Sequence, residues 1–316
     1  MLLEIYAKSD VGQKRKNNED NFLVLDLTAR YYWTASEGAD LPAALHHLED
    51  CEKGVVLIAA DGLGGEVAGE VASGLAVETV REYMAAPLDT ELTLGEHLRA
   101  AALQASQAVQ TKGRDPAFHK LGSTFTGAAI QNGVLEFVQI GDSRAYLLRG
   151  DKIKQISKDQ TLVQQLVDIG QISADEAERH PYKHVLIQAL GTDSGVNPAT
   201  GRIHLRRGDV VLLCSDGLSN KLEEEDLRLT IYAGESLAQT CEKLVAEANA
   251  RGGEDNITVV LARALGEDLP APDDERIMIE RFGARDYDET TTMGGISMEE
   301  LQATLPSFPT DPPLVG

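Results

Sequence analysis

Six acidic side chains in this sequence stand beside short apolar segments, where strands would begin or end. They are Glu19, Asp20, Asp61, Asp142, Asp216 and Asp255. Strand ends at one edge of a sheet pair can converge on a single cleft, and carboxylates that converge cannot all stay ionised without compensating positive charge. Because oxygen ligands select hard cations, the pattern predicts a site for Mg²⁺ or Mn²⁺. The chain has no HExxH motif and no paired Cys/His spacing, so a zinc site is not expected.

Each of these acidic motifs has a plainer interpretation when it is taken alone. Asp61-Gly62 and Asp216-Gly217 are common turn dipeptides, and Glu19-Asp20 is typical of a solvated surface pair. The motifs occur together, however, and each lies beside an apolar strand of one domain. Their combination therefore favours a shared metal site over a set of unrelated turns.

The glycine-rich run at residues 61–66 follows an apolar strand and precedes a helical pattern, so nucleotide binding has to be considered. A GxGxxG motif counted from Gly62 fails at Val67, and a P-loop counted from Gly64 has Glu70 where lysine is required. Both motifs fail at the position that carries the phosphate chemistry. Small residues here would instead let the backbone approach a cluster of metal ions and water.

A basic run, Lys14-Arg15-Lys16, stands just before Glu19 and Asp20 in a chain that is otherwise acidic. The plain interpretation is a solvated loop. The alternative is that Arg15 places its guanidinium beside the metal carboxylates and binds a phosphate group through two hydrogen bonds.

The overall charge excludes some classes of partner. The chain has 316 residues, of which 29 are basic and 51 acidic, and its net charge is −22. Such a surface repels nucleic-acid phosphates and anionic lipid headgroups, so neither nucleic acid nor a membrane is an expected partner.

Cys51, Cys214 and Cys241 form no CxxC pair and are expected to be reduced core thiols. With no signal peptide or apolar span visible, we expect a cytoplasmic protein.

Apolar periodicity locates the elements that must position these residues. Strands are expected at residues 2–7, 21–27, 55–60, 123–130, 134–140, 144–149, 152–156, 202–206, 209–215 and 256–263. Helical spacing is expected over about 67–84, 94–109, 160–169, 173–179, 222–232 and 236–250. Hairpins such as the one at Asn132-Gly133 alternate with helix pairs, which favours an α+β fold. If two antiparallel sheets face each other and a helix pair covers the outside of each, the apolar faces of both helix pairs are buried. We therefore predict a four-layer α-β-β-α sandwich.

The composition changes after Ala264, where acidic residues and prolines become frequent and lysine is absent. We therefore expect a catalytic domain over residues 1–264 and a flexible acidic tail over residues 265–316. In the tail, the threonines at 290–292 follow a run of acidic residues and could accept phosphate from a partner kinase. A solubilising linker is the plainer interpretation of the same segment.

Six short motifs occur in one order over residues 5–264. They are Arg15-Lys-Asn-Asn-Glu19-Asp20, Ala60-Asp61-Gly62-Leu-Gly64-Gly65, Gly122-Ser123-Thr124, Ile140-Gly141-Asp142-Ser143-Arg144, Cys214-Ser215-Asp216-Gly217-Leu218 and Glu254-Asp255-Asn256-Ile257-Thr258. In this order and spacing the chain resembles the bacterial branch of the metal-dependent type 2C protein serine/threonine phosphatases. The resemblance implies the same four-layer sandwich and identifies residues 157–201 as similar to the family's flap subdomain.

The resemblance also implies a centre with two Mg²⁺ or Mn²⁺ ions. Asp61 would bridge the two ions, and the carbonyl oxygen of Gly62 would bind one of them. Asp216 and Asp255 would complete the second ion's site. A water molecule held between two such ions has its pKa lowered toward neutrality and would attack phosphorus in line.

Four further roles follow from the same resemblance. Asp20 and Glu19 would support the ions mainly through bound water, and Asp142, together with Asp216, would hold a third, weaker ion. Arg15 would bind the substrate phosphate and neutralise charge on the transferring group. The implied reaction is hydrolysis of phosphoserine and phosphothreonine in proteins by a monomeric enzyme. Its expected partners are phosphorylated proteins, including a serine/threonine kinase.

Two features depart from the family pattern. Leu63 stands where some relatives have a histidine proposed as the general acid, so the leaving group would be protonated by metal-bound water, or the enzyme would depend on a good leaving group. Residues 28–54 are longer than the hairpin of bacterial relatives and include Tyr31, Tyr32 and Trp33. They are interpreted as an extended hairpin, with a docking surface as the alternative.

Two other functions remain open on the sequence. One is a phosphatase-like binding or regulatory module with weak catalysis, against which the intact Arg15, Asp61, Asp216 and Asp255 argue. The other is a metal-dependent phosphohydrolase that acts on a small phosphate ester.

Overall fold

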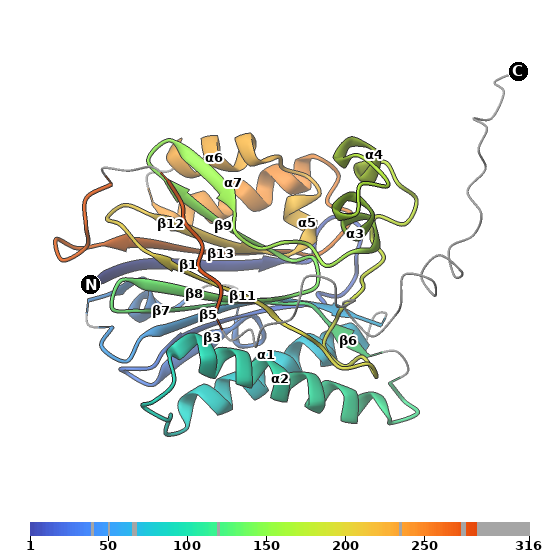
Figure 1. Cartoon of the computed structure of the whole chain (residues 1–316), viewed down its shortest axis with the longest axis horizontal. Coiled ribbons are helices and arrows are strands. Elements are labelled where there is room, and N and C mark those ends of the chain that lie inside the picture. The colour runs from blue at the N-terminus through green and yellow to red at the C-terminus, as the bar shows by residue number, and fades with distance from the viewer. Residues whose placement is uncertain are drawn as a thin grey trace, which may run out of the picture.

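Two antiparallel sheets lie face to face at the centre of the molecule (Figure 1). The computed structural model describes residues 1–38, 41–49, 51–64, 68–118, 121–233, 236–272 and 276–282. The first sheet has the order β10 (Lys152–Gln155), β9 (Arg144–Arg149), β12 (Val210–Cys214), β13 (Ile257–Leu265), β1 (Leu2–Asp10), β4 (His47–Leu48). The second has the order β11 (Ala199–His204), β8 (Val134–Ile140), β7 (Phe125–Gln131), β5 (Val55–Leu63), β2 (Asp20–Asp26), β3 (Tyr31–Thr34), with β6 (Gly122–Ser123) beside β5.

A helix pair covers the outer face of each sheet, as Figure 1 shows. The pair on the second sheet is α1 (Ala68–Ala85) and α2 (Leu94–Gly113). The pair on the first sheet is α6 (Glu224–Ala233) and α7 (Leu237–Ala250). The predicted α+β fold with four α-β-β-α layers is therefore confirmed. None of the helices in the described ranges combines the length and apolar content that a membrane span requires.

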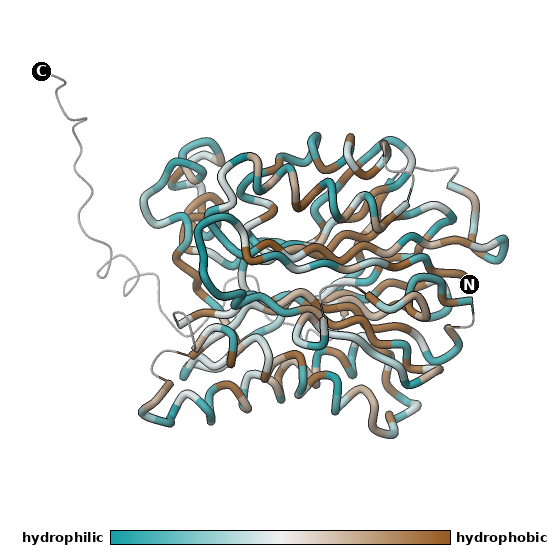
Figure 2. The backbone as a smooth tube through the Cα atoms, turned by 180° about the vertical axis from the view of Figure 1, so that it is seen from behind, coloured by the Kyte–Doolittle hydropathy of each residue, from teal (hydrophilic) through white to brown (hydrophobic). Residues whose placement is uncertain are grey.

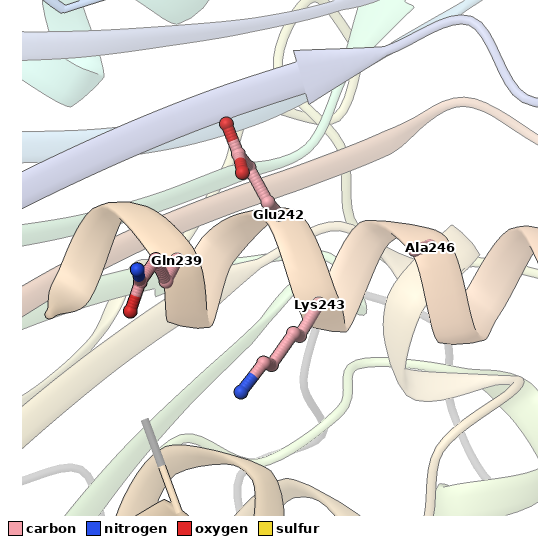
Figure 3. Close-up of a pocket in the computed structure, with 4 residues that line it drawn as sticks. All are labelled: Gln239, Glu242, Lys243 and Ala246. Carbon is pink, nitrogen blue, oxygen red and sulfur yellow. The ribbon is translucent and has the colours of Figure 1, made fainter. Parts of the chain in front are cut away.

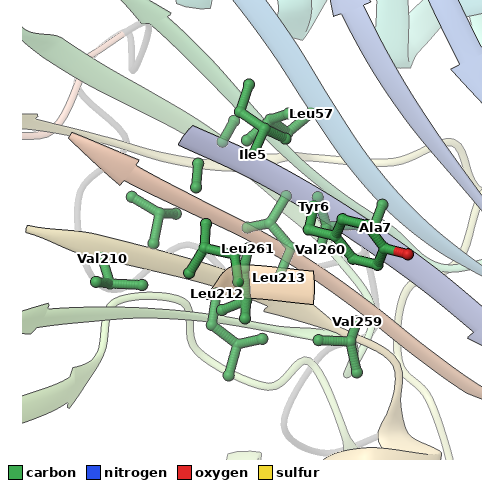
Figure 4. Packing of buried hydrophobic residues seen from close by; sticks show 14 of the residues in the cluster. Ile5, Tyr6, Ala7, Leu57, Val210, Leu212, Leu213, Val259, Val260 and Leu261 are labelled. Carbon is green, nitrogen blue, oxygen red and sulfur yellow. The ribbon is translucent and has the colours of Figure 1, made fainter. Parts of the chain in front are cut away.

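Two apolar clusters join the four layers, which explains why the central strands are apolar without interruption. The larger cluster fills the space between the sheets and continues beneath α6 and α7, and the smaller one lies beneath α1 and α2. In β5, Leu57 faces the core between the sheets, whereas its neighbour Ile58 faces the core beneath α1 and α2. Successive strand residues point to opposite faces, so a strand covered on both sides buries both sets. Figure 4 shows side chains of the core between the sheets, including Ile5, Leu57 and Val260. Figure 2 shows hydrophobic residues concentrated along the strands of both sheets.

The strand boundaries differ from the expected ones at one place that matters for function. We expected a strand to end at residue 60, just before Asp61. Instead β5 runs through Asp61 to Leu63, because its last residues pair with the short β6. Asp61 therefore lies within a paired strand, which holds its backbone more firmly than a turn would.

The segment at residues 28–54 is not the extended hairpin that we expected. Its first strand, β3, pairs with β2 at the edge of the second sheet. The chain then crosses to the first sheet, where β4 pairs with β1. Leu41, Leu45 and Leu48 of this crossing segment are buried in the core between the sheets. The insertion thus closes one open edge of the sandwich.

The opposite edge of the sandwich is closed by residues that follow β13. We call residues 266–272 and 276–282 the C-terminal strap. Our expectation was a flexible tail from residue 265 onward, but the strap packs on the domain. Its residues 277 and 279 pack against the core between the sheets, and Phe282 is buried in the core beneath the helices. The rest of the expected tail, with its three threonines, lies outside the described residues.

Hydrogen bonds hold the strap along the edge strands. The main chains of Arg202 in β11 and Glu280 exchange two hydrogen bonds, of 2.6 and 2.9 Å. On the other sheet, the buried Arg149 donates to the carbonyl oxygen of Arg276 at 2.9 Å. The Arg202 guanidinium also lies over the Phe282 ring, 5.6 Å from its centre. The strap therefore bridges both sheets rather than extending one of them.

The segment at residues 157–201, the flap, contains two short helices beside the strand ends (Figure 1). They are α3 (Leu162–Asp168) and α4 (Ala174–Glu178). Both begin with a hydroxyl side chain that caps the helix, Thr161 and Ser173. An isolated bridge pairs Thr161 with Leu186 and closes the loop that carries both helices.

Candidate metal centre

Asp20 and Asp61 face each other at one end of the second sheet. Asp20 begins β2 and is paired directly with Asp61 near the end of β5. The buried Thr124 fixes the Asp61 backbone, because its hydroxyl accepts from the Asp61 N–H at 2.9 Å and its own N–H donates to the Asp61 carbonyl at 2.8 Å. Two carboxylates from separate parts of the sequence are thus held side by side by strand register.

Asp216 and Asp255 come to this end from the first sheet. Asp216 begins α5 (Asp216–Ser219), which follows β12, and Asp255 lies two residues before β13. Ser215 joins the two sheets, since its hydroxyl donates to an Asp20 carboxylate oxygen at 2.6 Å and accepts from the Thr258 N–H at 2.9 Å. The predicted convergence of strand ends from both sheets is what the structure shows for these residues.

The pKa of Asp61 shows that the charges of the other aspartates act on its carboxyl group. Burial raises its pKa well above the ordinary value for aspartate, and the charges of Asp20, Asp216, Asp142 and Asp255 raise it further, in that order. Like charges that are close together disfavour one another's ionised forms. Asp61 therefore lies at the centre of the cluster.

The pKa values of three neighbours of Asp61 are raised as well. Burial raises the pKa of Asp20 to about 7, against the hydrogen bond from Ser215 that lowers it. Burial followed by the charge of Asp216 raises the pKa of Asp142 to about 7. The pKa of Asp216 is raised first by burial, while the flap residue His184 lowers it. Burial and mutual repulsion therefore favour the protonated form of these carboxyls, and a bound cation would favour the ionised form.

The residues fit a hard divalent cation. One carboxylate oxygen of Asp20 and one of Asp216 are buried with no hydrogen-bond partner among the described residues. A buried acceptor without a partner is destabilising, and a cation bound to it would remove that penalty. Within the described part of the chain, no three acidic, histidine or cysteine side chains are already gathered around one point. The fit to a cation therefore rests on these two unpartnered oxygens and on the all-oxygen donor set.

Glycines let backbone segments approach one another closely at this site. A Cβ atom added to Gly62 would lie 2.0 Å from the Gly69 carbonyl oxygen and 2.7 Å from the Glu19 carbonyl oxygen. A Cβ atom on Gly217 would lie 2.0 Å from the Asn256 carbonyl oxygen. These contacts leave no room for a side chain beside the predicted carbonyl ligand, Gly62. Gly65, from the same motif, lies outside the described residues.

Arg15 lies at the rim of the cluster, with 45% of its side chain exposed. Its Nη2 donates to an Asp255 carboxylate oxygen at 2.8 Å, and its Nη1 lies 3.8 Å from a Glu19 carboxylate oxygen. The hydrogen bond to Asp255 is the largest cause that raises the pKa of Arg15. The structure thus places Arg15 beside two of the predicted metal-site carboxylates.

Asp142 reaches the cluster from the loop between β8 and β9. The next residues hold this loop in place. Ser143 is fully buried and its hydroxyl is bonded to that of Thr124 at 2.7 Å. Arg144 forms a bidentate ion pair with Asp159 at the start of the flap, with distances of 2.7 to 3.0 Å. The Asp142 loop is therefore attached both to the Asp61 strand and to the flap.

Several uncharged polar residues that build this site have no role that the sequence predicts. The buried Asn256 accepts from the Glu19 N–H at 2.8 Å and donates to the carbonyl oxygens of Val11 and Asn17, both at 3.0 Å. It thereby anchors the loop that carries Arg15. Asn256, Ser215 and Thr124 all lie in the recognised motifs, but uncharged residues give no sequence signal of burial.

Other candidate chemistry is excluded by burial. The three cysteines are free and buried, as expected. Burial raises the pKa of the Cys214 thiol to about 12, so it is not a thiolate nucleophile near neutral pH.

A hollow on α7 is lined by Gln239, Glu242, Lys243 and Ala246 (Figure 3), and none of the six acidic residues contributes to it.

The chain is similar to known proteins over most of its length. A family model described as "Protein phosphatase 2C" matches residues 44–262. The protein phosphatase PhpP of Streptococcus pneumoniae is 33% identical over 267 residues, which cover 84% of this chain and 99% of PhpP. The serine/threonine phosphatase Stp of Listeria innocua is 32% identical, with 80% of this chain and 93% of Stp covered.

Solved structures show the same likeness. The Mycobacterium tuberculosis serine/threonine phosphatase PstP/Ppp has a TM-score of 0.69 and 34% identity, with 84% of this chain and 100% of that chain covered. The catalytic domain of PstP in complex with two manganese ions has a TM-score of 0.67 and 33% identity over the same shares of both chains.

Proposed function

Because the chain belongs to the protein phosphatase 2C family, we propose that it hydrolyses phosphoserine and phosphothreonine at the carboxylate cluster around Asp61. It is a metal-dependent serine/threonine protein phosphatase, as its relatives with 31–34% identity over most of the chain are. One observation supports this site above all: Asp61 is the direct strand partner of Asp20, and Ser215 of the other sheet, next to Asp216, donates a hydrogen bond to the Asp20 carboxylate.

The proposed ion ligands are residues that this cluster brings together. Asp61 and the Gly62 carbonyl, with Asp216 and Asp255, would hold two divalent ions, and Asp142 with Asp216 would hold a third, weaker one. Ions bound there supply a water molecule of lowered pKa and neutralise charge on the phosphoryl group. Mn²⁺ or Mg²⁺ is supported by the all-oxygen donor set and by the two manganese ions bound in the PstP structure.

The remaining proposed roles are to support the ions and to neutralise the charge of the substrate phosphate. Glu19 and Asp20 are both buried, and Ser215 fixes the orientation of the Asp20 carboxylate. Arg15 would bind the substrate phosphate. A guanidinium has five N–H donors, so those that Asp255 does not occupy remain free to reach phosphate oxygens from the exposed side.

The proton for the leaving oxygen has to come from a group other than residue 63. Leu63 has no proton donor, so we propose that water protonates the leaving serine or threonine oxygen. A consequence is that aryl phosphates, whose leaving groups need no proton, should react faster than alkyl phosphates.

The chemistry of the substrate indicates the partners. Phosphoserine and phosphothreonine in proteins are produced by phosphoryl transfer from a nucleotide, so a serine/threonine kinase must supply each substrate of this enzyme. We propose that phosphorylated proteins, including such a kinase, are its partners. A monomeric form and a cytoplasmic location belong to the same proposal.

The experiment that tests this function measures phosphate release from a phosphothreonine peptide with and without Mn²⁺. We expect release that requires Mn²⁺ or Mg²⁺ and stops when the ions are removed. Release that survives in excess EDTA would contradict the proposed metal site. A parallel assay with a small phosphate ester of a metabolite distinguishes a protein phosphatase from a small-molecule phosphohydrolase.

A further inference from the structure

Leu63 lies on the same face of β5 as Asp61. Successive residues of a strand point to opposite faces, and earlier in β5 Leu57 and Ala59 face the core between the sheets. By this alternation Asp61 and Leu63 face the gap between the sheets, at the end where the acidic residues meet. The burial pattern agrees, because both residues are half-buried whereas Gly62 between them is buried. Leu63 therefore presents an apolar side chain beside the proposed bridging aspartate.

The pairing of β5 fixes the position of Leu63. Its register continues unbroken from β7 to β6, where Gly62 lies opposite Ser123 and Leu63 lies opposite Gly122. The Gly62 N–H also donates to the Glu19 carbonyl oxygen at 3.1 Å. A strand rises about 3.3 Å per residue, so the Cα atom of Leu63 lies about 7 Å from that of the proposed bridging aspartate.

Leu63 packs in neither apolar cluster of the sandwich. Among the residues that the structure describes, it is absent from the buried members of both clusters and from the half-buried side chains packed against them. Its cross-strand partner is Gly122, and its neighbours along the chain are Gly62 and Gly64. None of these three glycines has a side chain that could cover it. The leucine side chain therefore gains its full apolar burial only when another molecule covers it.

The substrate supplies an apolar group at this place. A phosphoryl group held by ions at Asp61 is joined through its ester oxygen to the Cβ atom of the phosphorylated residue. That carbon atom lies a few ångströms from the ions, which is within reach of a leucine side chain on the same face. In phosphothreonine this carbon carries a methyl group, which phosphoserine lacks. Contact with Leu63 would remove that methyl group from water.

We propose that Leu63 is a specificity-determining residue that contacts the leaving group and selects phosphothreonine over phosphoserine. The proposal rests on the proposed function, because it takes Asp61 as the residue around which the ions and the phosphoryl group bind. Burial of one methyl group corresponds to a preference of about fourfold in kcat/KM. The same position that lacks a proton donor thus provides an apolar contact for the departing side chain.

The test compares two peptides that differ only in phosphothreonine or phosphoserine. Leu63→Asn keeps nearly the size of the side chain and removes its apolar character, whereas Leu63→Met keeps both. The matched control is Leu92→Asn, because Leu92 is 45% exposed and precedes α2. We expect a preference of about fourfold in the wild type, in Leu63→Met and in Leu92→Asn, and nearly equal kcat/KM values for the two peptides in Leu63→Asn.

Two further measurements separate this contact from damage to the metal centre. The Mn²⁺ concentration for half-maximal rate and the melting temperature should be unchanged in Leu63→Asn, because the side chain belongs to neither cluster. Peptides in which a CH₂ group replaces the ester oxygen cannot be hydrolysed, so their calorimetric titration into the Mn²⁺-loaded protein measures affinity without turnover. The phosphothreonine analogue should bind more tightly than the phosphoserine analogue to the wild type, and equally tightly to Leu63→Asn.

A preference for phosphothreonine that persists undiminished in Leu63→Asn would overturn the proposal, and so would a wild type that hydrolyses both peptides equally well. If Leu63→Asn does not fold, Leu63→Ala takes its place, because it also removes most of the apolar contact and should lower the preference. A wild type that hydrolyses neither peptide would instead refute the proposed function. The binding comparison with the two analogues would still test the contact in that case.

Discussion

Asp20 and Asp61 are direct partners across the pair β2 and β5, although 40 residues separate them in the sequence. Their carboxylates are brought together by strand register, and Ser215 then ties Asp20 to the other sheet. The centre is therefore a property of the whole sandwich, since both sheets contribute to it and neither contains it alone.

Asp61→Asn should lower kcat on a phosphothreonine peptide by orders of magnitude. The change removes a negative charge at the position that the other aspartates surround, where both ions are proposed to bind. Asp151→Asn is the matched control, because the Asp151 side chain is 84% exposed and pairs only at the surface. Near-normal turnover of Asp61→Asn in saturating Mn²⁺ would show that Asp61 is not the bridging ligand.

Arg15→Ala should chiefly raise KM for the phosphorylated substrate. A charge-assisted hydrogen bond to phosphate is worth about 1.5–3 kcal/mol, which corresponds to a rise of roughly tenfold or more. Lys14→Ala provides the control, because Lys14 is the exposed basic neighbour of Arg15. Steady-state kinetics at a fixed Mn²⁺ concentration compare KM and kcat of the two variants. Equal effects of both substitutions would mean that only the general positive charge of the loop matters.

The metal-free protein should lose stability as the pH rises from about 4 to about 8. The pKa of Asp20 is about 7 in the folded chain and about 3.9 when unfolded, so the folded state binds more protons between these values. The stability gained from the protonated carboxyl is complete below pH ~4 and is lost as the pH passes through 7.

Thermal unfolding across this pH range measures the effect. Mn²⁺ should restore the stability at high pH, because an ion replaces the protons, and it should have little effect at pH 5. Asp20→Asn should flatten the pH dependence. A metal-free melting temperature that rises steadily between pH 5 and 8 would contradict the protonation of the cluster.

The C-terminal strap should be needed for full stability. The sequence alone predicts that a chain ending near residue 264 keeps its melting temperature, but the docked strap reverses that prediction. A chain ending at Leu265 should melt several degrees lower than one ending at Phe282.

Single substitutions within the strap sharpen this test. Phe282→Ala should destabilise the protein by about 2 kcal/mol, since it empties a buried position, whereas Met278→Ala should change stability by less than about 0.5 kcal/mol because Met278 is 74% exposed. Similar unfolding curves for the two variants would show that the strap contributes nothing to stability.

Much of the fold could be predicted because the residue patterns that indicate its strands and turns lie within short stretches of sequence. The run at residues 55–60 is apolar on both faces, as a strand between two cores must be. The hairpin at Asn132-Gly133 is confirmed by positive φ angles of 51° and 75°, which these two residue types tolerate best. The positions of the acidic residues beside strands likewise predicted that Asp20, Asp216 and Asp255 would lie near Asp61.

The remainder could not be predicted because it depends on contacts between distant segments. The strap has the composition of a disordered tail, and only the alternation of Ile277 and Ile279 around the exposed Met278 indicates an edge segment. The insertion before β5 carries no sequence signal that its second strand joins the other sheet. Asn256 and Ser215 become candidates for building the site only when their buried partners are known.

The measurement that tests the central claim most directly is calorimetric titration of Mn²⁺ into the metal-free protein. The proposed site predicts at least two ions per chain in the wild type and in Asp151→Asn, and loss of both tight sites in Asp61→Asn. Such a result would place the ions at the strand ends where Asp20 and Asp61 meet. Two ions bound by Asp61→Asn with wild-type affinity would contradict a metal centre built around Asp61.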